Sequence, residues 1–414
     1  MEAGATRASA HPGSQPDEAW LRDLVETVAS IHRPTASHGE RVAAEWVAER
    51  LRELGATGAR VEREQVHGTF WWPLGLAAGA AVLAGIATLR GRPGLGAALA
   101  GAAGAAALDD LPPGSRTLRS WLPQRQATTV VGEMGPSGAD RTVAAGADRT
   151  VVLVAHHDAA HAGLIYHPAI PELVFGRLPW LIERSNTSPP LMAPAVAVPA
   201  LVGAGALSGR RGLTKAGMAL AVASAAALAD IALRDAVPGA NDNATGVAAL
   251  LALARSLDLR PTERVRVMFV STSEEALCEG MHSFCRRHLP DLPPERTFFL
   301  VLDTLGSPHL LVLRGEGMIR MREYPQRSLE LLDGTAEELG IRLFPNLRLR
   351  NATDGIIPLA ARYECAALAS CTDLKQPANY HWPTDVPDNV DYGTLSDAVR
   401  LTEAVVRRLD ERWL

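Results

Sequence analysis

Three runs of apolar and β-branched residues constrain the fold of this chain most strongly. They cover residues 149–155, 264–271 and 297–304, and each is apolar at nearly every position rather than at every second one. Strands with this pattern are buried on both faces, as in the centre of a sheet that helices cover. Strand and helix patterns alternate along the chain, so the sequence predicts an α/β sandwich. Apolar residues recur at helical spacing in 18–33, 37–55, 243–257, 274–288, 325–339 and 392–411.

Four further apolar segments are rich in Ala and Gly. Residues 70–88 pair with 95–108, and residues 191–207 pair with 216–233, with Arg and Lys in the short links. Each segment is near or below the roughly 20 residues that span a bilayer. We expect two inserted apolar helical hairpins. The charge pattern favours a multi-pass, membrane-associated protein, and the alternative is that the Ala-rich helices pack on each other or on the enzyme.

The hairpins interrupt a single catalytic domain. We expect its N-terminal helices in 1–69, the first hairpin in 70–110, the first part of the catalytic sheet in 111–163, an apolar insertion with the second hairpin in 164–235, and the remainder in 236–414. The first of these segments is charged throughout, so no signal peptide is expected. Cationic hairpin links would place the enzyme outside the cell, whereas a charged N-terminal segment opposes its own export, and both orientations stay open.

Composition excludes some classes of function. The formal net charge is −5 without a dense Lys/Arg block, which argues against a nucleic-acid partner. Cys278 and Cys285 are about 10 Å apart in an expected helix, so we predict buried thiols rather than disulfides. The hexapeptide GADRTV occurs at 138–143 and 146–151. It is too short for a solenoid repeat and predicts only a duplication in a surface hairpin.

Metal-binding and acidic side chains follow each of the three predicted strands. His156 and Asp158 end the first strand two positions apart, so they point to the same face. Glu274 and Glu275 follow the second strand, and Asp303 closes the third. Ligands of open α/β folds bind at the carboxyl ends of the strands, where these side chains would meet.

Two more motifs complete a possible metal site. Asp242 lies at the start of a predicted helix, where Asn241 or Asn243 could cap the helix and leave the carboxylate free to bridge two ions. His381 lies on a Pro-rich loop near the end of the chain. Imidazole and carboxylate ligands with open positions for water suit a pair of zinc ions. The predicted ligands are His156, Asp242, Glu275, Asp303 and His381.

The ordered motifs His-x-Asp, Asn-Asp-Asn-x-x-Gly, Glu-Glu, Leu-Asp and Tyr-His-x-x-x-Asp resemble those of the di-zinc aminopeptidases of the aminopeptidase Y and bacterial leucyl aminopeptidase type. The resemblance covers most of residues 115–410 outside the insertion. It implies the zinc exopeptidase fold, a three-layer α/β sandwich with a mixed, centrally parallel sheet. In that family only a short loop separates the first His from the bridging Asp, whereas 86 positions separate His156 from Asp242, so the mouth of the site must be remodelled.

The resemblance also implies a role for each residue. Asp158 would orient His156, and Glu274 would be the general base. The implied ligand sets are His156, Asp242 and Asp303 for one zinc, and Asp242, Glu275 and His381 for the other. Cobalt or manganese would accept the same ligands.

The expected activity is release of N-terminal residues from peptides by a water that two zinc ions activate. Three alternatives stay open: a glutaminyl cyclase with one zinc, a carboxypeptidase or dipeptidase, and a catalytically dead, membrane-bound binding protein. The complete ligand set argues against the last, because buried carboxylates without a purpose are costly. Substrate side-chain preference and oligomeric state are not predicted.

Overall fold

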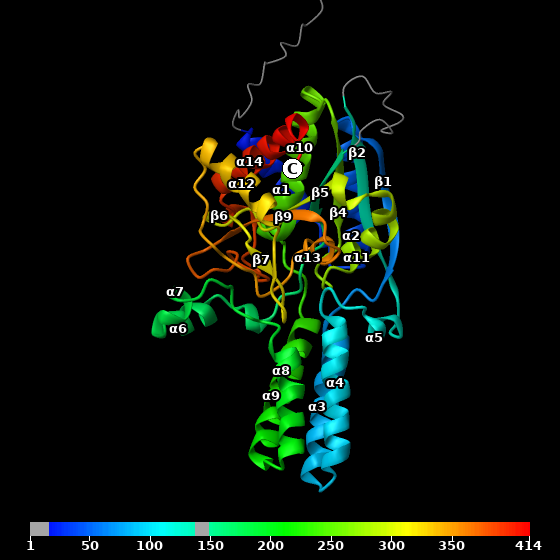
Figure 1. The fold of residues 1–414 in the computed structure, drawn as a ribbon, viewed down its shortest axis with the longest axis vertical. Helices are drawn as coiled ribbons and strands as arrows, with labels where there is room; N and C mark the ends of the chain where they lie inside the picture. The colour runs from blue at the N-terminus through cyan, green and yellow to red at the C-terminus, as the bar shows by residue number, and fades with distance from the viewer. Residues whose placement is uncertain (1–15, 137–148) are drawn as a thin grey trace, which may run out of the picture.

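The computed structural model of the 414-residue chain describes residues 16–136 and 149–414. The start of the chain, the first GADRTV copy and part of the second lie outside the described residues, so the expectations made for them are not addressed. The rest divides into a catalytic domain and a helical bundle that projects from one end of it (Figure 1).

A seven-stranded mixed sheet forms the centre of the catalytic domain. Its four central strands, in the order β4-β3-β5-β9, run parallel, and β1, β2 and β6 pair antiparallel at the two sides. The three predicted runs are β3, β4 and β5, which confirms that they are central strands. The strands are β1 Thr57–Val66, β2 Arg125–Met134, β4 Val265–Thr272, β3 Arg149–His156, β5 Thr297–Leu302, β9 Glu364–Cys371 and β6 His309–Val312.

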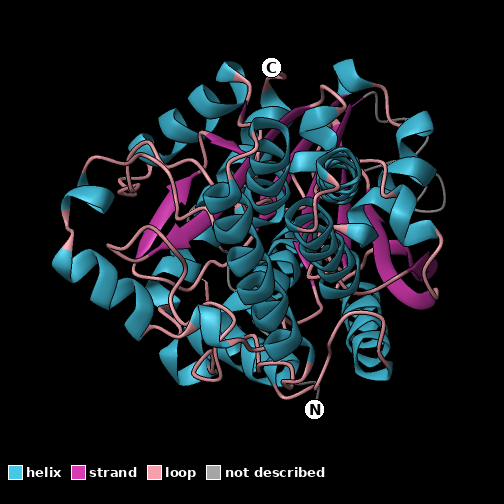
Figure 2. Cartoon of the chain, turned by 90° about the horizontal axis from the view of Figure 1, so that it is seen from below, coloured by secondary structure: helices cyan, strands magenta, loops and turns pink. Residues whose placement is uncertain are grey.

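Helices cover both faces of this sheet, which confirms the predicted three-layer sandwich (Figure 2). One layer contains α1 (Glu18–Ala29), α2 (His38–Glu53), α10 (Thr245–Leu259) and α14 (Tyr392–Glu411), which pack against one another. The opposite layer contains α11 (Glu279–His288) and α13 (Ile356–Ala360). A further helix, α12 (Gln326–Glu338), packs against α14 of the first layer and against strands β9 and β6.

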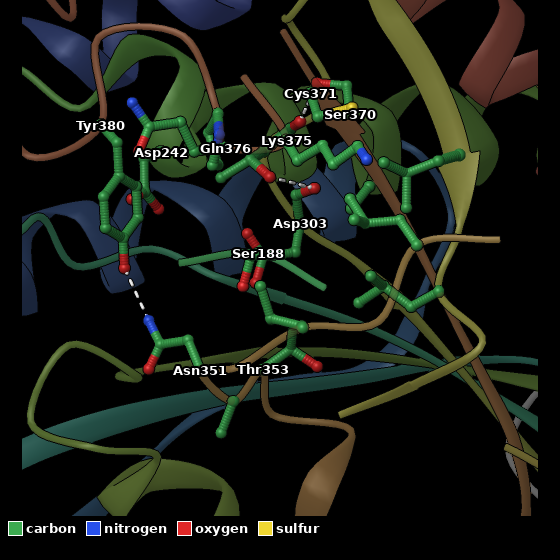
Figure 3. A pocket seen from close by; sticks show the side chains of 18 of the residues that line it. Ser188, Asp242, Asp303, Asn351, Thr353, Ser370, Cys371, Lys375, Gln376 and Tyr380 are labelled. Atoms are coloured by element: carbon green, nitrogen blue, oxygen red, sulfur yellow. Dashed lines mark hydrogen bonds between the residues drawn. The ribbon is translucent and has the colours of Figure 1, made fainter. Parts of the chain in front are cut away.

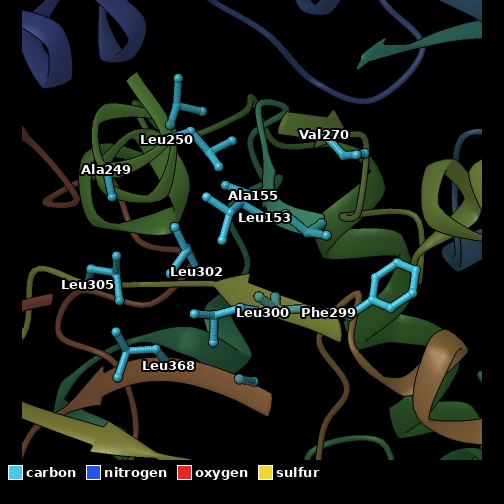
Figure 4. Close-up of a cluster of buried hydrophobic side chains, with 14 of the residues drawn as sticks. Leu153, Ala155, Ala249, Leu250, Val270, Phe299, Leu300, Leu302, Leu305 and Leu368 are labelled. Carbon is cyan, nitrogen blue, oxygen red and sulfur yellow. The ribbon is translucent and has the colours of Figure 1, made fainter. Parts of the chain in front are cut away.

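The core between the sheet and α10 consists of aliphatic side chains (Figure 4). Leu153 of β3, Leu250 of α10 and Leu300 of β5 are completely buried. Burial of one such side chain stabilises the fold by about 1.5–3 kcal/mol. All four cysteines are buried free thiols, as expected.

The helix predicted over 274–288 starts five residues late, as α11. Backbone N–H groups of Glu274 and Glu275 donate to the Asp158 carboxylate at 2.8 and 3.1 Å. The carbonyl of the following residue accepts a hydrogen bond from Arg119. Leu277 and Cys278 adopt left-handed φ values of 65° and 60°, which a right-handed helix does not contain, so residues 274–278 form a loop at the sheet edge and the helix begins after it.

The two apolar hairpins pack together into one four-helix bundle. Its helices are α3 (Trp71–Leu89), α4 (Pro93–Asp110), α8 (Pro194–Ser208) and α9 (Arg211–Ala232). Small residues allow close contact: a Cβ on Gly217 would lie 2.7 Å from Val202 Cγ2, and one on Gly205 would lie 2.5 Å from Thr214 Oγ1. The bundle leaves the domain at the edge where the central parallel strands end (Figure 1).

Candidate metal centre

The end of β3 places one imidazole and one carboxylate on the same face, as predicted. His156 Nδ1 lies 3.2 Å from Asp158 Oδ1, and both side chains are buried. Asp158 also accepts a hydrogen bond from the Thr35 hydroxyl at 2.6 Å. His157 points to the other face, where its Nδ1 lies 3.0 Å from Ser271 Oγ. Asp158 therefore holds the ring of His156 with its Nε2 atom directed toward the other predicted ligands.

Closure of the long insertion brings the two halves of the site together. His161 and Ala236 pair as an antiparallel bridge at its base. The buried guanidinium of Arg33 donates to the carbonyls of His157 at 2.8 Å and Gly239 at 2.7 Å. These contacts place the motifs on either side of the insertion next to each other, although 86 positions separate their predicted ligands.

Asp242 lies in an irregular turn, Ala240–Ala244, directly before α10. The neighbouring Asn243 side chain accepts the Gly246 N–H at 3.0 Å, so this asparagine caps the helix. The Asp385 carboxylate accepts the Asp242 N–H at 3.1 Å. Because the Asn243 side chain and the Asp385 carboxylate accept the backbone N–H groups here, the Asp242 carboxylate is free to face the site.

The five predicted ligands come together around Asp242. Its Oδ1 lies 3.1 Å from His156 Nε2, and its Oδ2 lies 3.3 Å from His381 Nε2. His381 Nε2 lies 3.3 Å from Glu275 Oε2. Asp242 and Asp303 project into the pocket from separate elements (Figure 3). One carboxylate thus presents an oxygen to each of two imidazoles.

Glu274 lies in the same cluster. Its Oε2 is 4.0 Å from His156 Nε2. One ligand atom each from His156, Glu274 and Asp303 lies within 4.8 Å of the others, and the same holds for His156, Asp242 and Glu275. The geometry therefore groups Glu274 with two of the predicted ligands, whereas the resemblance implies a separate role for it as a base.

Burial and crowded charges perturb the carboxylates strongly. Burial and the Asp303 charge raise the pKa of Glu274 well above its usual value, and burial raises the pKa of Asp303 to about 7. Burial also acts to raise the pKa of Asp242. Hydrogen bonds from His156 and His381 nevertheless hold this pKa below the usual range.

The donor set fits a divalent metal. Among the described residues, Glu274 Oε2 and Glu275 Oε1 are buried oxygens without a hydrogen-bond partner. An unpaired buried carboxylate oxygen is costly, and a cation at this position removes the cost. Imidazole nitrogens and carboxylate oxygens are ligands that zinc accepts.

Buried arginines hold the loop that carries the two glutamates. Arg119, from the segment after the first hairpin, donates to the carbonyl of Ala276 at 2.6 Å. Its guanidinium also pairs with Asp110 at 2.6 Å and Glu279 at 3.1 Å. Because Asp110 is the last residue of α4, this network joins the bundle to the glutamate loop.

Sequence reasoning missed several residues around the site. The Tyr166 ring lies 4.6 Å from the His381 ring in an edge-on contact, and the Tyr380 ring stacks on His381 at 3.8 Å. Asp354 is fully buried, and burial raises its pKa to about 6. Tyr380 and Asp385 belong to the motif that contains His381 and could have been found there. Tyr166 comes from the insertion, where no pattern indicated a site.

The cluster lines one end of a pocket of about 750 Å³ (Figure 3). The opposite wall is aliphatic, and Asn351 at the rim donates to the Tyr380 hydroxyl at 2.8 Å. Lys375 is the only Lys or Arg among the described lining residues, and its ammonium donates to the carbonyls of Ile182 and Ser185. The aliphatic wall consists of Leu311, Leu313, Leu347, Leu349 and Ala369.

Fold and site together define a zinc-exopeptidase type of α/β protein, and solved structures share this fold. An aminopeptidase from Aneurinibacillus sp. strain AM-1 aligns with TM-score 0.56 and 13% identity, over 96% of this chain and 95% of the other. A Tannerella forsythia glutaminyl cyclase aligns with TM-score 0.56 and 15% identity, over 95% and 99%. A zinc aminopeptidase from Bacillus subtilis aligns with TM-score 0.53 and 14% identity, over 94% of each chain.

The sequence family agrees with the fold. Residues 225–406, from the end of α9 into α14, match the model of peptidase family M28, which confirms the predicted resemblance. No protein of curated function matches the chain in sequence. The family match and the neighbours support a zinc-dependent, metallopeptidase-like enzyme. Because aminopeptidases and glutaminyl cyclases share the fold, the specific reaction is argued from the site.

Proposed function

We propose that the protein is a metal-dependent aminopeptidase with two zinc ions. The observation that carries this proposal is the Asp242 carboxylate, whose two oxygens lie 3.1 and 3.3 Å from the imidazoles of His156 and His381. Zinc held by these residues would polarise the peptide carbonyl and lower the pKa of a water molecule. The residues of the chain would supply positioning and proton transfer.

In this reaction Asp158 positions a metal ligand and Glu274 transfers a proton. Asp158 fixes the His156 ring and accepts the Glu274 backbone N–H at 2.8 Å, so ligand and base are held by one group. The Glu274 side chain keeps an unpaired oxygen that points into the cluster. We infer that this oxygen takes a proton from the attacking water and passes it to the departing amine.

The lining of the pocket favours peptide substrates whose N-terminal residue has an apolar side chain. Leucine side chains and Ala369 form the wall opposite the cluster, where the side chain of the first residue would lie. A carboxypeptidase needs a free cation for the substrate carboxylate. Lys375 instead directs its ammonium to the carbonyls of Ile182 and Ser185, which favours action at the amino terminus.

Hydrolysis of aminoacyl fluorogenic amides tests this function. We expect turnover of Leu and Phe amides to exceed that of Asp and Lys amides, to disappear after chelation and to return with zinc. Ammonia released from an N-terminal Gln peptide would identify a cyclase instead, and cleavage of N-blocked dipeptides only would identify a carboxypeptidase. No turnover by protein that retains its zinc would contradict the proposal.

We further propose that the four-helix bundle spans a membrane. Two of its helices, Trp71–Leu89 and Arg211–Ala232, are long and apolar enough to do so. Only 17% of the most apolar window of Arg211–Ala232 is buried, so it does not resemble the core helix of a soluble protein. A helix that is apolar all round and not covered by protein requires an apolar solvent.

The charge distribution of the bundle supports the same placement. Its helices contain 15 to 22 residues and are therefore about 22–33 Å long, close to the roughly 30 Å of a hydrocarbon core. Their acidic residues lie at the catalytic end, and their cations lie at the far tip. These are Asp109, Asp110 and Asp230 at one end, and Arg90, Arg92, Arg210, Arg211 and Lys215 at the other.

An arginine in the middle of the bundle distinguishes membrane from water. Leu220 is 51% exposed near the centre of α9. In water, Leu220→Arg should change stability by less than about 0.5 kcal/mol, whereas at a bilayer centre an arginine costs about 2.5–3.5 kcal/mol. We expect this variant to lose carbonate-resistant membrane association. Leu207→Arg, 81% exposed at the cationic tip, is the control and should stay inserted. Wild-type protein that carbonate releases from membranes would contradict the proposal.

A further inference from the structure

An apolar arm leaves the catalytic domain beside the bundle. It covers residues 164–183 and contains α6 (Ala169–Arg177) and α7 (Trp180–Glu183), neither of which has a buried residue. Leu173 is 57% exposed and Trp180 is 52% exposed. Further large exposed side chains of the arm are Leu164, Ile165, Ile170, Val174, Leu178 and Leu181. So many large exposed apolar side chains on one short segment are typical of a surface that contacts a partner or a lipid bilayer.

Exposed tryptophans lie at the same level elsewhere around the bundle. Trp121 follows the short helix α5 (Thr117–Ser120) and is 80% exposed. Trp72, in the first turn of α3, is 58% exposed. In Figure 1, α5 lies on one side of the bundle and α6 and α7 lie on the other, where the helices leave the domain. Tryptophan is enriched at this depth in membrane proteins, because its ring is apolar and its N–H is polar.

The arm adjoins the catalytic pocket. Tyr166, near the start of the arm, contacts the His381 ring, and the chain returns from the arm through Ser188 and Leu191, which line the pocket. A second hollow of about 630 Å³ lies between the arm and the loop that carries Tyr380. The arm therefore forms one side of the entrance to the metal centre.

An apolar path continues from this entrance into the bundle. A third hollow of about 660 Å³ lies between α3, α8 and α9. It shares Tyr166 and Leu191 with the hollow under the arm, and Leu191 also lines the catalytic pocket. Leu191 thus lines all three hollows, from the bundle to the pocket that holds the predicted metal ligands.

We propose that the arm and Trp121 rest in the interface of a lipid bilayer, so that the catalytic pocket opens at the membrane surface and receives the N-termini of membrane-bound peptides. This inference rests on the proposed aminopeptidase function and names its substrate class. The occupant of the apolar surface is the bilayer, because the surface continues directly into a bundle of membrane-spanning length. Its tryptophans also lie on both sides of that bundle, whereas a protein partner on the arm alone would leave Trp121 uncovered.

Lipid contact can be measured without any activity. A fluorescent label on Leu173→Cys, in protein reconstituted into vesicles, should be quenched by spin-labelled lipid. The four native cysteines are buried and should not react. A label on Glu263→Cys, exposed at the opposite edge of the sheet, is the control and should not be quenched. An unquenched label at position 173, whether solvent-exposed or shielded by a second copy or another protein, would overturn the proposal.

Substrate preference gives the second measurement. Two peptides with the same N-terminal residues are compared, one soluble and one with a C-terminal acyl chain that anchors it in the vesicle. We expect kcat/KM for the anchored peptide to be at least about tenfold higher, because anchoring raises the local concentration at the pocket. A variant with Leu173→Glu, Leu178→Glu and Trp180→Glu should lose this preference and keep its rate on the soluble peptide within about twofold.

The two measurements separate this inference from the proposed function. Leu259→Glu, at a residue 64% exposed at the end of α10, is the matched control and should retain the preference. Equal rates on both peptides, or a preference that survives the triple substitution, would contradict the inference while leaving the aminopeptidase intact. If neither peptide is cleaved, the aminopeptidase function fails, and lipid quenching still decides where the arm lies.

Discussion

Replacing Glu274 by glutamine should lower kcat by about 10²–10⁴-fold, the usual contribution of a general base, while the zinc content stays unchanged. Glutamine has the size and shape of glutamate, but it cannot accept a proton from water. The backbone N–H of residue 274 would still donate to Asp158, so the loop should stay in place. Steady-state kinetics and metal analysis of the same preparation give the two values.

A substitution of Glu275 distinguishes the role of a metal ligand from the role of a general base. Glu275→Gln should lower zinc content, because Glu275 faces His381 at 3.3 Å. Glu45→Gln, on the exposed surface of α2, is the control for the chemical change alone and should behave as wild type. Glu274 Oε2 lies 4.0 Å from His156 Nε2, so both atoms could bind the same metal ion. Loss of zinc in Glu274→Gln would therefore identify Glu274 as a ligand and refute its role as base.

Asp242→Asn should abolish activity and the binding of both zinc ions. Its two oxygens face two different imidazoles, so one substitution weakens both sites. An amide is a poorer zinc ligand than a carboxylate, and its NH₂ group cannot coordinate at all. A calorimetric titration of the metal-free protein with zinc should show two sites in the wild type and no tight site in the variant.

The variant Asp303→Asn is compared with Asp242→Asn to test whether Asp242 bridges the two zinc ions. Asp303 lies close to His156 in the cluster, so its loss should weaken one site and leave the other. Asp258→Asn, on an exposed part of α10, controls for the chemical change. A wild-type protein that binds a single zinc, or an Asp242→Asn variant that retains one tight site, would contradict the bridging arrangement and favour a cyclase-like centre.

Local patterns in the sequence predicted the central strands and the side chains that the structure brings together around Asp242. Strands β3, β4 and β5 are uniformly apolar because both faces are covered, and this requirement is visible in each run separately. Strand β3 ends at His156 and strand β5 ends one residue before Asp303, because polar side chains are costly inside such an apolar layer. The sequence predicted Asn241 or Asn243 as the cap that leaves the Asp242 carboxylate free, and in the structure Asn243 accepts the Gly246 N–H.

The tertiary structure alone decided how these pieces meet. Helix α11 starts after a left-handed turn at Leu277 and Cys278, in a loop that Asp158 and Arg119 hold from distant parts of the chain, and local propensity could not reveal it. Arg33 and the pairing of His161 with Ala236 close an insertion whose two ends are unrelated in sequence pattern. Tyr166 reaches His381 only because that closure folds the insertion over the site. The hairpins were visible separately, but their union into one bundle beside an apolar arm follows from contacts between distant segments, which short-range periodicity does not encode.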